Sequence, residues 1–229
     1  MSSPARANTI FRDRADAGRW LAALLAGYRE SQPVIYALPR GGVVVGAEIA
    51  RALAARLEAV IARKVGHPQS PEYAVCAVGA SGYLVCNEAE RRSLDPAWFE
   101  EAVERERREA ARRQAIYLEG RQPISAEGRT AILVDDGIAT GLTMRAAVQE
   151  IKGQQPRQLV VAVPVIPRET AALLNREVDA IVAVDIPELF LGAVGAYYVD
   201  FQQVTDDEVI RLLRQSAAGA SAGSASPRD

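Results

Sequence analysis

The chain has 229 residues, of which 49% are hydrophobic, and this is enough for one well-packed core. Its formal net charge of −2 gives no electrostatic reason to expect a nucleic-acid or membrane partner. No apolar run reaches the ~18 residues of a membrane span, and the start of the chain lacks an apolar signal segment. With only two cysteines, the composition predicts a cytoplasmic protein.

Short apolar runs alternate with segments of helical periodicity along the chain, which is typical of an α/β fold. Proline and glycine punctuate the runs. In chain order the pattern predicts a helix over 11–28, a strand over 34–38, a helix over 44–56, a strand over 58–65, a polar loop over 66–72, a hairpin over 73–88, a long charged helix from 96 to about 120, a strand over 129–135, a helix over 142–151, a strand over 158–166, a helix over 168–178 and a strand over 180–186.

The apolar strands show no clean alternation, as expected where helices cover both faces of a sheet. We therefore predict a single doubly wound, mostly parallel sheet flanked by helices, with a β-hairpin at its edge. Residues 1–215 form one domain, and the small, polar segment 216–229 is expected to be a disordered tail. Cys76 and Cys86 would lie opposite each other in the hairpin, which makes a disulfide between them geometrically conceivable. Free buried thiols are the expectation for a reducing compartment.

The segment AILVDDGIATGLT, residues 131–143, places two adjacent carboxylates at the end of a buried strand. Gly137 and Gly141 allow a tight turn and a close approach of the backbone to a ligand. The backbone N–H groups that follow lead into a helix N-terminus and form a phosphate cradle. Because Asp135 and Asp136 would repel phosphate, they are expected to face vicinal sugar hydroxyls or a hydrated magnesium ion. The motif predicts a 5′-phosphosugar site; its alternative is a helix N-cap with chance acids.

The same segment resembles the ribose-phosphate signature of the type I phosphoribosyltransferases, which use phosphoribosyl pyrophosphate (PRPP). Gly137 stands where an aliphatic residue is commoner. The stretch ALPRGGVVVGAEIA resembles the family's pyrophosphate loop, where a cis non-proline peptide is often found, and Lys64 matches a basic residue on the pyrophosphate side. The resemblance covers roughly residues 34–201. It implies a small hood over the site and a flexible flap over 66–78.

The resemblance implies transfer of the 5-phosphoribosyl group of PRPP to a nitrogen acceptor, with release of pyrophosphate and with Mg²⁺ as cofactor. It assigns catalysis to Asp135, Asp136, Lys64 and Arg40, the 5-phosphate to Ala139, Thr140, Gly141, Leu142 and Thr143, and the pyrophosphate to Arg40, Gly41, Gly42 and Lys64. Further candidates are Glu72 and His67 in the flap, Phe190, Tyr197 and Phe201 at the acceptor base, and Asp200 at the metal. A solvated loop is the plain alternative for Glu72 and His67, and a core position for the aromatic residues.

The sequence does not identify the acceptor. Ala139 stands where hypoxanthine and guanine enzymes usually carry an aspartate, and the run ATGLTM resembles adenine enzymes, but PRGG and the segment after Pro187 do not. We expect a nucleobase-like acceptor of nucleotide salvage, with PRPP as the other partner, and we allow for a homodimer. The alternative is a PRPP-binding regulatory or accessory protein on the same fold without turnover. A hydrolase or phosphorylase of ribosyl substrates would need a positioned water or phosphate.

Overall fold

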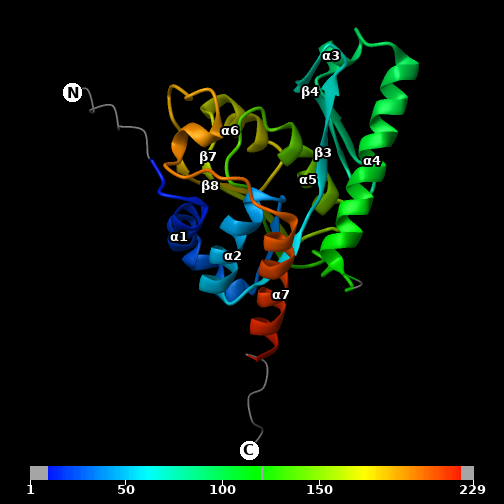
Figure 1. Cartoon of the computed structure of the whole chain (residues 1–229). Coiled ribbons are helices and arrows are strands. Elements are labelled where there is room, and N and C mark those ends of the chain that lie inside the picture. Colours follow the sequence, from blue (N-terminus) through cyan, green and yellow to red (C-terminus); the bar gives the residue numbers. More distant parts are fainter. Residues whose placement is uncertain (1–9, 120, 223–229) are drawn as a thin grey trace, which may run out of the picture.

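The computed structural model describes residues 10–119 and 121–222 (Figure 1). Its helices are α1 (Arg14–Leu24), α2 (Gly41–Leu53), α3 (Glu88–Arg91), α4 (Pro96–Leu118), α5 (Leu142–Lys152), α6 (Arg168–Leu174) and α7 (Asp206–Ala222), with 3-10 turns η1 (Ala26–Ser31) and η2 (Val194–Tyr197). Its strands are β1 (Val34–Ala37), β2 (Arg56–Ala59), β3 (Ala62–His67), β4 (Ser70–Gly79), β5 (Leu84–Cys86), β6 (Thr130–Val134), β7 (Gln158–Val165) and β8 (Ala180–Asp185).

Five of the strands form one parallel sheet in the order β2-β1-β6-β7-β8, which confirms the predicted fold class. The strand order changes direction at β1: the next strand in sequence, β2, lies on one side of β1, and β6 lies on the other side. A reversal of this kind leaves a crevice between the loops that follow the two strands, at their carboxyl ends. The loops after β1 and β6 are therefore the expected place for a ligand.

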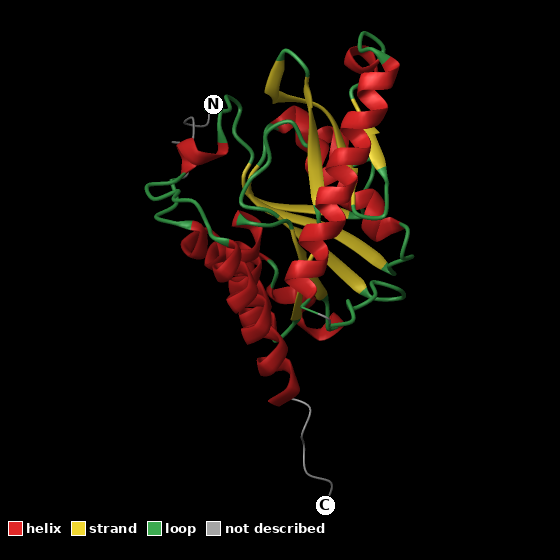
Figure 2. Ribbon diagram, turned by 45° about the vertical axis from the view of Figure 1, so that its right-hand side comes forward, coloured by secondary structure: helices red, strands yellow, loops and turns green. Residues whose placement is uncertain are grey.

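Helices cover both faces of this sheet (Figures 1 and 2). On one face Ile35 and Ile132 pack with apolar residues of α1, α2 and α7 in one core cluster. On the other face Tyr36 and Leu133 pack with Met144 and further residues of α5. The strands are therefore buried on both sides, which explains why their sequences show no alternation.

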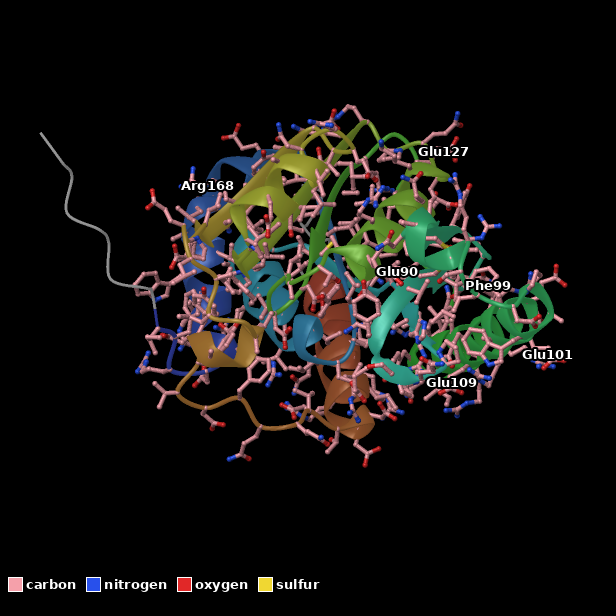
Figure 3. All side chains as sticks on the ribbon, turned by 90° about the horizontal axis from the view of Figure 1, so that it is seen from above. Glu90, Phe99, Glu101, Glu109, Glu127 and Arg168 are labelled. Carbon is pink, nitrogen blue, oxygen red and sulfur yellow. A yellow bond between two sulfur atoms is a disulfide. The ribbon has the colours of Figure 1, made fainter. Side chains whose placement is uncertain are left out.

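The segment expected as one strand over 58–65 is two strands, β2 and β3, and β3 leaves the main sheet. It pairs with β4, and β4 with β5, in a separate antiparallel sheet that α4 covers along its length (Figures 1 and 3). Val65, Val75 and Phe99 belong to the small core between this sheet and α4, while Glu101 points outward from the helix. The polar segment 66–72, predicted as a loop, is thus the tip of the β3–β4 hairpin.

Cys76 and Cys86 form a disulfide, so the expectation of free thiols was wrong. The two residues are directly opposite in the β4–β5 register, with their Cα atoms 4.0 Å apart. The symmetric hairpin predicted from the sequence places them there, and this proximity overrides the argument from composition.

The last element of the described residues is a helix that the sequence analysis did not predict. α7 packs its Val209 and Leu213 into the core beside α2 and continues to Ala222, so it overlaps the expected tail over 216–229. The rest of that expectation, beyond residue 222, lies outside the described residues. Within the described ranges, no helix is long and apolar enough to cross a membrane.

Candidate functional site

The loop after β6 follows a fully buried strand and brings two carboxylates to the carboxyl edge of the sheet. Asp135 and Asp136 are both half-buried. Gly137 then adopts a φ of +154°, and a Cβ there would collide with Val194 of the hood, which we define as residues 186–205. The hood packs against the backbone at this position. This contact explains why glycine replaces the commoner aliphatic residue.

The two carboxylates have different partners. The backbone N–H of Asp136 donates to Asp135 Oδ1 at 2.8 Å, whereas Arg14 Nε donates to Asp136 Oδ2 at 2.6 Å. Burial, reinforced by the negative charge of Asp136, raises the pKa of Asp135 well above its usual value. Burial also raises the pKa of Asp136, but the positive charge of Arg14 opposes that rise. The sequence analysis missed Arg14, which no local motif marks.

The rest of the loop has the geometry of a phosphate cradle. Gly141, with φ +80°, is the N-cap of α5, and a Cβ there would lie 2.7 Å from Thr170 Cγ2. Thr170 also donates from its hydroxyl to the carbonyl of Ala139 at 2.9 Å, which fixes the loop from outside. The first N–H groups of a helix have no acceptor within it. They are therefore available to an anion at residues 140–143.

A cavity of about 820 Å³ opens over this loop. From the parallel-sheet side it is lined by Asp135, Asp136, Gly137, Ile138, Ala139, Thr140, Gly141, Thr143 and Met144. From the antiparallel sheet and α4 it is lined by Ala62, Arg63, Lys64, Gly66, His67, Pro68, Pro71, Glu72, Trp98, Arg105 and Glu106. The fold therefore brings the acid pair and the phosphate loop opposite the predicted flap.

Lys64 lies in β3 and is exposed on this opposite wall. Its positive charge lowers the pKa of Asp135, against the larger effect of burial. Both residues line the cavity, Lys64 from the antiparallel sheet and Asp135 from the loop after β6. His67 and Glu72 line the cavity near the hairpin tip. His67 Nδ1 accepts from the backbone N–H of Gln69 at 3.2 Å, which shapes that tip.

The loop after β1 contains the cis peptide bond expected from the resemblance, between Pro39 and Arg40. Pro39 lines the cavity, but Arg40, Gly41 and Gly42 are not among the residues that do so in the described part of the chain. The charge of Arg40 acts on Tyr117, near the end of α4, where it opposes the rise in the pKa of that phenol to about 12 that burial causes. Arg40 is exposed.

Gly41 and Gly42 pack against the acid pair itself. A Cβ at Gly41 would overlap Asp136 Oδ2, and one at Gly42 would lie 2.9 Å from Asp135 Cα. The glycine pair is thus required by the close approach of α2 to the end of β6, a reason that the PRGG turn alone did not reveal.

The aromatic candidates for the acceptor base pack within the hood. Phe190 stacks on Tyr197, which is fully buried, and Phe201 packs on Tyr198. None of the three candidates, nor Asp200, is among the residues that line the cavity. Leu142 is likewise buried beside Ala77 and Val85, so it can offer only its backbone.

Trp98, in the first turn of α4, is the tryptophan that does line the cavity. It is half-buried, so part of its ring is open to a ligand. The sequence analysis missed this residue, and the signal available for it was a lone tryptophan at the start of a highly charged helix.

No group of three or more His, Cys, Asp or Glu side chains in the described ranges could hold a metal ion. The wall of the cavity that contains the phosphate loop has two carboxylates, Asp135 and Asp136, and the second is bonded to Arg14. This donor set fits a magnesium ion that keeps most of its water and takes its other oxygens from a phosphorylated ligand.

A protein-family model described as "Phosphoribosyl transferase domain" matches residues 8–189. Two Mycobacterium tuberculosis proteins, named "Putative phosphoribosyl transferase Rv0571c" and "Putative phosphoribosyl transferase MT0597", are each 40% identical over 206 residues, or 89% of this chain. The chain spans 46% of the length of these curated relatives. The crystal structure of TT1426 from Thermus thermophilus has a TM-score of 0.76 and 42% identity, over 90% of this chain and 99% of that one.

The family model covers most of the chain, including the acid pair, the phosphate loop and Lys64. These are the same residues from which the sequence predicts the site. The chain belongs to the phosphoribosyl transferase domain family.

Proposed function

We propose that the protein is a magnesium-dependent phosphoribosyltransferase that transfers the 5-phosphoribosyl group of PRPP to a nitrogen acceptor and releases pyrophosphate. The observation that supports this most is the acid pair and phosphate cradle on one wall of the cavity, with Lys64 on the other. Anion-binding N–H groups, carboxylates and a cation are spaced around one ligand-sized space. They match the phosphate, the ribose hydroxyls and the pyrophosphate of PRPP.

The loop of residues 139–143 would hold the 5-phosphate, because its N–H groups are at a helix N-terminus and Thr140 and Thr143 add hydroxyls. Asp135 and Asp136 would accept hydrogen bonds from the ribose hydroxyls. Lys64 would offset the charge of the pyrophosphate. Arg40, with the backbone of Gly41 and Gly42, would join it after a movement that brings these residues to the cavity.

In the reaction the acceptor nitrogen forms a bond to ribose C1, and the bond from C1 to the pyrophosphate oxygen breaks with its electron pair. The protein's part is to position the two reactants, to stabilise the charge that grows on the leaving group, and to exclude water. Magnesium, held through PRPP oxygens and water near Asp135 and Asp136, would offset part of the same charge. The β3–β4 hairpin is placed to cover C1 during transfer.

We place the acceptor at Trp98 rather than within the hood, because an aromatic ring that lines the cavity can stack on a flat heterocycle. A nucleobase-like compound of nucleotide salvage fits this surface. We retain a cytoplasmic location as part of the proposal, although the Cys76–Cys86 disulfide argues for an oxidising compartment. A homodimer is a further expectation that sedimentation can test.

The test compares ligand binding with turnover. PRPP with magnesium should raise the melting temperature by mass action, and ribose 5-phosphate should do so less. Asp135→Asn should weaken PRPP binding, measured by calorimetry, while leaving the protein folded. Pyrophosphate release is then followed against purines, pyrimidines and amines. Tight PRPP binding without release for any acceptor would favour the regulatory alternative, and no binding at millimolar PRPP would refute the proposal.

A further inference from the structure

Arg14 reaches the candidate site from the opposite end of the chain. It is the first residue of α1 and pairs with Asp136, 122 residues later, through an Nε–Oδ2 contact of 2.6 Å. The side chains are only 12% and 16% exposed, respectively. A pair sheltered to this degree is little screened by water, and removal of one partner leaves a charge that nothing offsets.

Two further contacts fix the guanidinium of Arg14. Its Nη1 donates to the carbonyl of Gln202 at 2.7 Å, and its Cζ lies 3.7 Å from the ring centroid of Phe201. A planar guanidinium can stack on the ring and donate in two directions at once, whereas a lysine ammonium would retain the charge without the plane. The orientation of Arg14 is therefore determined at three points.

The hood, whose Phe201 and Gln202 contact Arg14, is also bonded to Asp136 directly. Tyr198 donates from its hydroxyl to the main-chain carbonyl of Asp136 at 2.6 Å. The chain around Tyr198 is joined to the N-terminal segment, because Phe11 donates its N–H to Tyr197 at 2.8 Å and accepts from Val199 at 2.8 Å. Residues near both ends of the domain thus form one clamp on Asp136.

Arg14 does not itself line the cavity, whereas Asp136 does, as judged over the described residues. A Cβ at Gly41 would meet both Asp136 Oδ2 and Arg14 Nε, so the pair packs directly on the backbone of the loop after β1. We propose that Arg14 is a positioning residue for PRPP binding: it orients the Asp136 carboxylate toward the ribose hydroxyls without contacting the ligand. This inference rests on the proposed function and assigns to it a residue outside every motif of the site.

A purely structural role for Arg14 would predict a different result. In that case its loss would lower the melting temperature and leave the PRPP affinity of the folded protein unchanged. A positioning role predicts a loss of affinity in protein that is still folded at the temperature of the measurement. The two roles are therefore separated by measuring both quantities on each variant.

The experiment uses Arg14→Met, Arg14→Lys and, as a matched control on the same helix, Arg19→Met. Arg19 pairs with Asp16 at 3.3 Å and is 45% exposed. Calorimetry with PRPP and magnesium should show at least a tenfold loss of affinity for Arg14→Met, a smaller loss for Arg14→Lys, and none for the control. If Arg14→Met does not fold, the comparison of Arg14→Lys with the control decides. Wild-type affinity in both Arg14 variants would overturn the inference.

A double-mutant cycle tests whether Arg14 acts through Asp136. Asp136→Asn alone should weaken PRPP binding, and adding Arg14→Met to it should cause no further loss. Fully additive losses would mean that Arg14 affects the ligand by another route, and would overturn the inference while leaving the proposed function intact. Failure of the wild type to bind PRPP would remove both.

Discussion

The two walls of the cavity are built on different principles. The wall that contains the acid pair belongs to the parallel sheet and is held by contacts from distant parts of the chain, including Arg14, Thr170 and Val194. The antiparallel wall is held by a core that it shares with α4, in which Val75 and Phe99 are buried, by one disulfide, and by the packing of Ala77 and Val85 on α5. One wall is thus held from distant parts of the chain, and the other by its packing on α4 and α5.

This difference suggests a division of labour. A site for a common ligand such as PRPP benefits from fixed geometry, because misplacement of a charge by an ångström costs rate. A wall formed by other strands than those of the parallel sheet can vary its cavity-facing residues without replacing the residues that hold the acid pair. We infer that the parallel-sheet wall binds the phosphoribosyl group, and that the antiparallel wall supplies leaving-group charge, closure and acceptor choice. A change in one wall should therefore leave the task of the other intact.

The largest effect is expected from Lys64→Ala. If Lys64 stabilises charge that develops on the leaving pyrophosphate, its loss should slow pyrophosphate release by about 10²–10³, as for other preorganised charge contacts. PRPP affinity should fall much less, since the interaction is strongest in the transition state.

The chain offers a matched control, because its other lysine, Lys152, is exposed at the end of α5. Lys152→Ala should change neither quantity. Equal losses of affinity and turnover in Lys64→Ala would contradict its leaving-group role. They would also contradict the assignment of separate tasks to the two walls.

Loss of the disulfide should affect one wall only. Reduction, or Cys86→Ala, should destabilise the β4–β5 hairpin by about 2–4 kcal/mol, which is typical for a short closed loop. Hydrogen exchange should rise in β4 and β5 and stay unchanged in β6, with PRPP affinity within about twofold of wild type. A comparable loss of PRPP affinity would show that the two walls are coupled. Thiol alkylation and mass spectrometry of protein from reducing cells would test the cytoplasmic expectation.

Trp98→Ala should impair the acceptor and spare PRPP. Stacking of a base on an aromatic side chain contributes about 1–3 kcal/mol, so KM for the acceptor should rise by about 5- to 150-fold. The only other tryptophan in the chain, Trp20, is 51% exposed on α1. A Trp20→Phe variant therefore reports on Trp98 alone, and quenching of its fluorescence gives an acceptor screen that does not require turnover. An unchanged KM in Trp98→Ala would contradict the placement of the acceptor at Trp98 and would favour an acceptor site in the hood.

The wall that contains the acid pair could be predicted from the sequence, because the residues that indicate it are close together in the chain. Short apolar runs predict strands, and the acids, glycines and threonines of 135–143 are consecutive, so their chemistry can be read together. The same pattern predicted a mostly parallel sheet, although it did not indicate that β1 pairs with β6. What a local pattern cannot give is the partner of Asp136, because that contact depends on how the two ends of the domain fold together.

The antiparallel wall was harder to predict for other reasons. The polar, proline-containing segment 66–72 has the composition of a loop, yet it is the tip of a hairpin whose stems are buried by α4. The pairing of Cys76 with Cys86 required the strand register, and the expectation about the compartment was given more weight than the geometry. Phe190 and Tyr197 were aromatic and close to the site in sequence, but they are needed by the core of the hood.

The smallest effect is expected from Asp135→Asn in the absence of ligand. This substitution in the site should stabilise the folded protein. The pKa of Asp135 is raised by burial and by Asp136. A group with a raised pKa stabilises the folded state fully only below its unfolded-state pKa, and that contribution is lost as the pH rises through the folded-state pKa. At neutral pH, which is above the unfolded-state pKa, the raised pKa of Asp135 therefore lowers the free energy of unfolding, and the variant should melt a few degrees higher than wild type.

The gain should shrink as the pH falls toward about 4, the ordinary pKa of an aspartate, because the wild type then has a neutral carboxyl as well. Thermal melts across this range test the prediction, with Asp207→Asn, at an exposed position in α7, as the control. Equal melting temperatures at every pH would mean that Asp135 costs the fold nothing. A variant that is more stable without PRPP and yet binds it less well would identify Asp135 as a charge kept for its ligand, since packing alone would favour the amide.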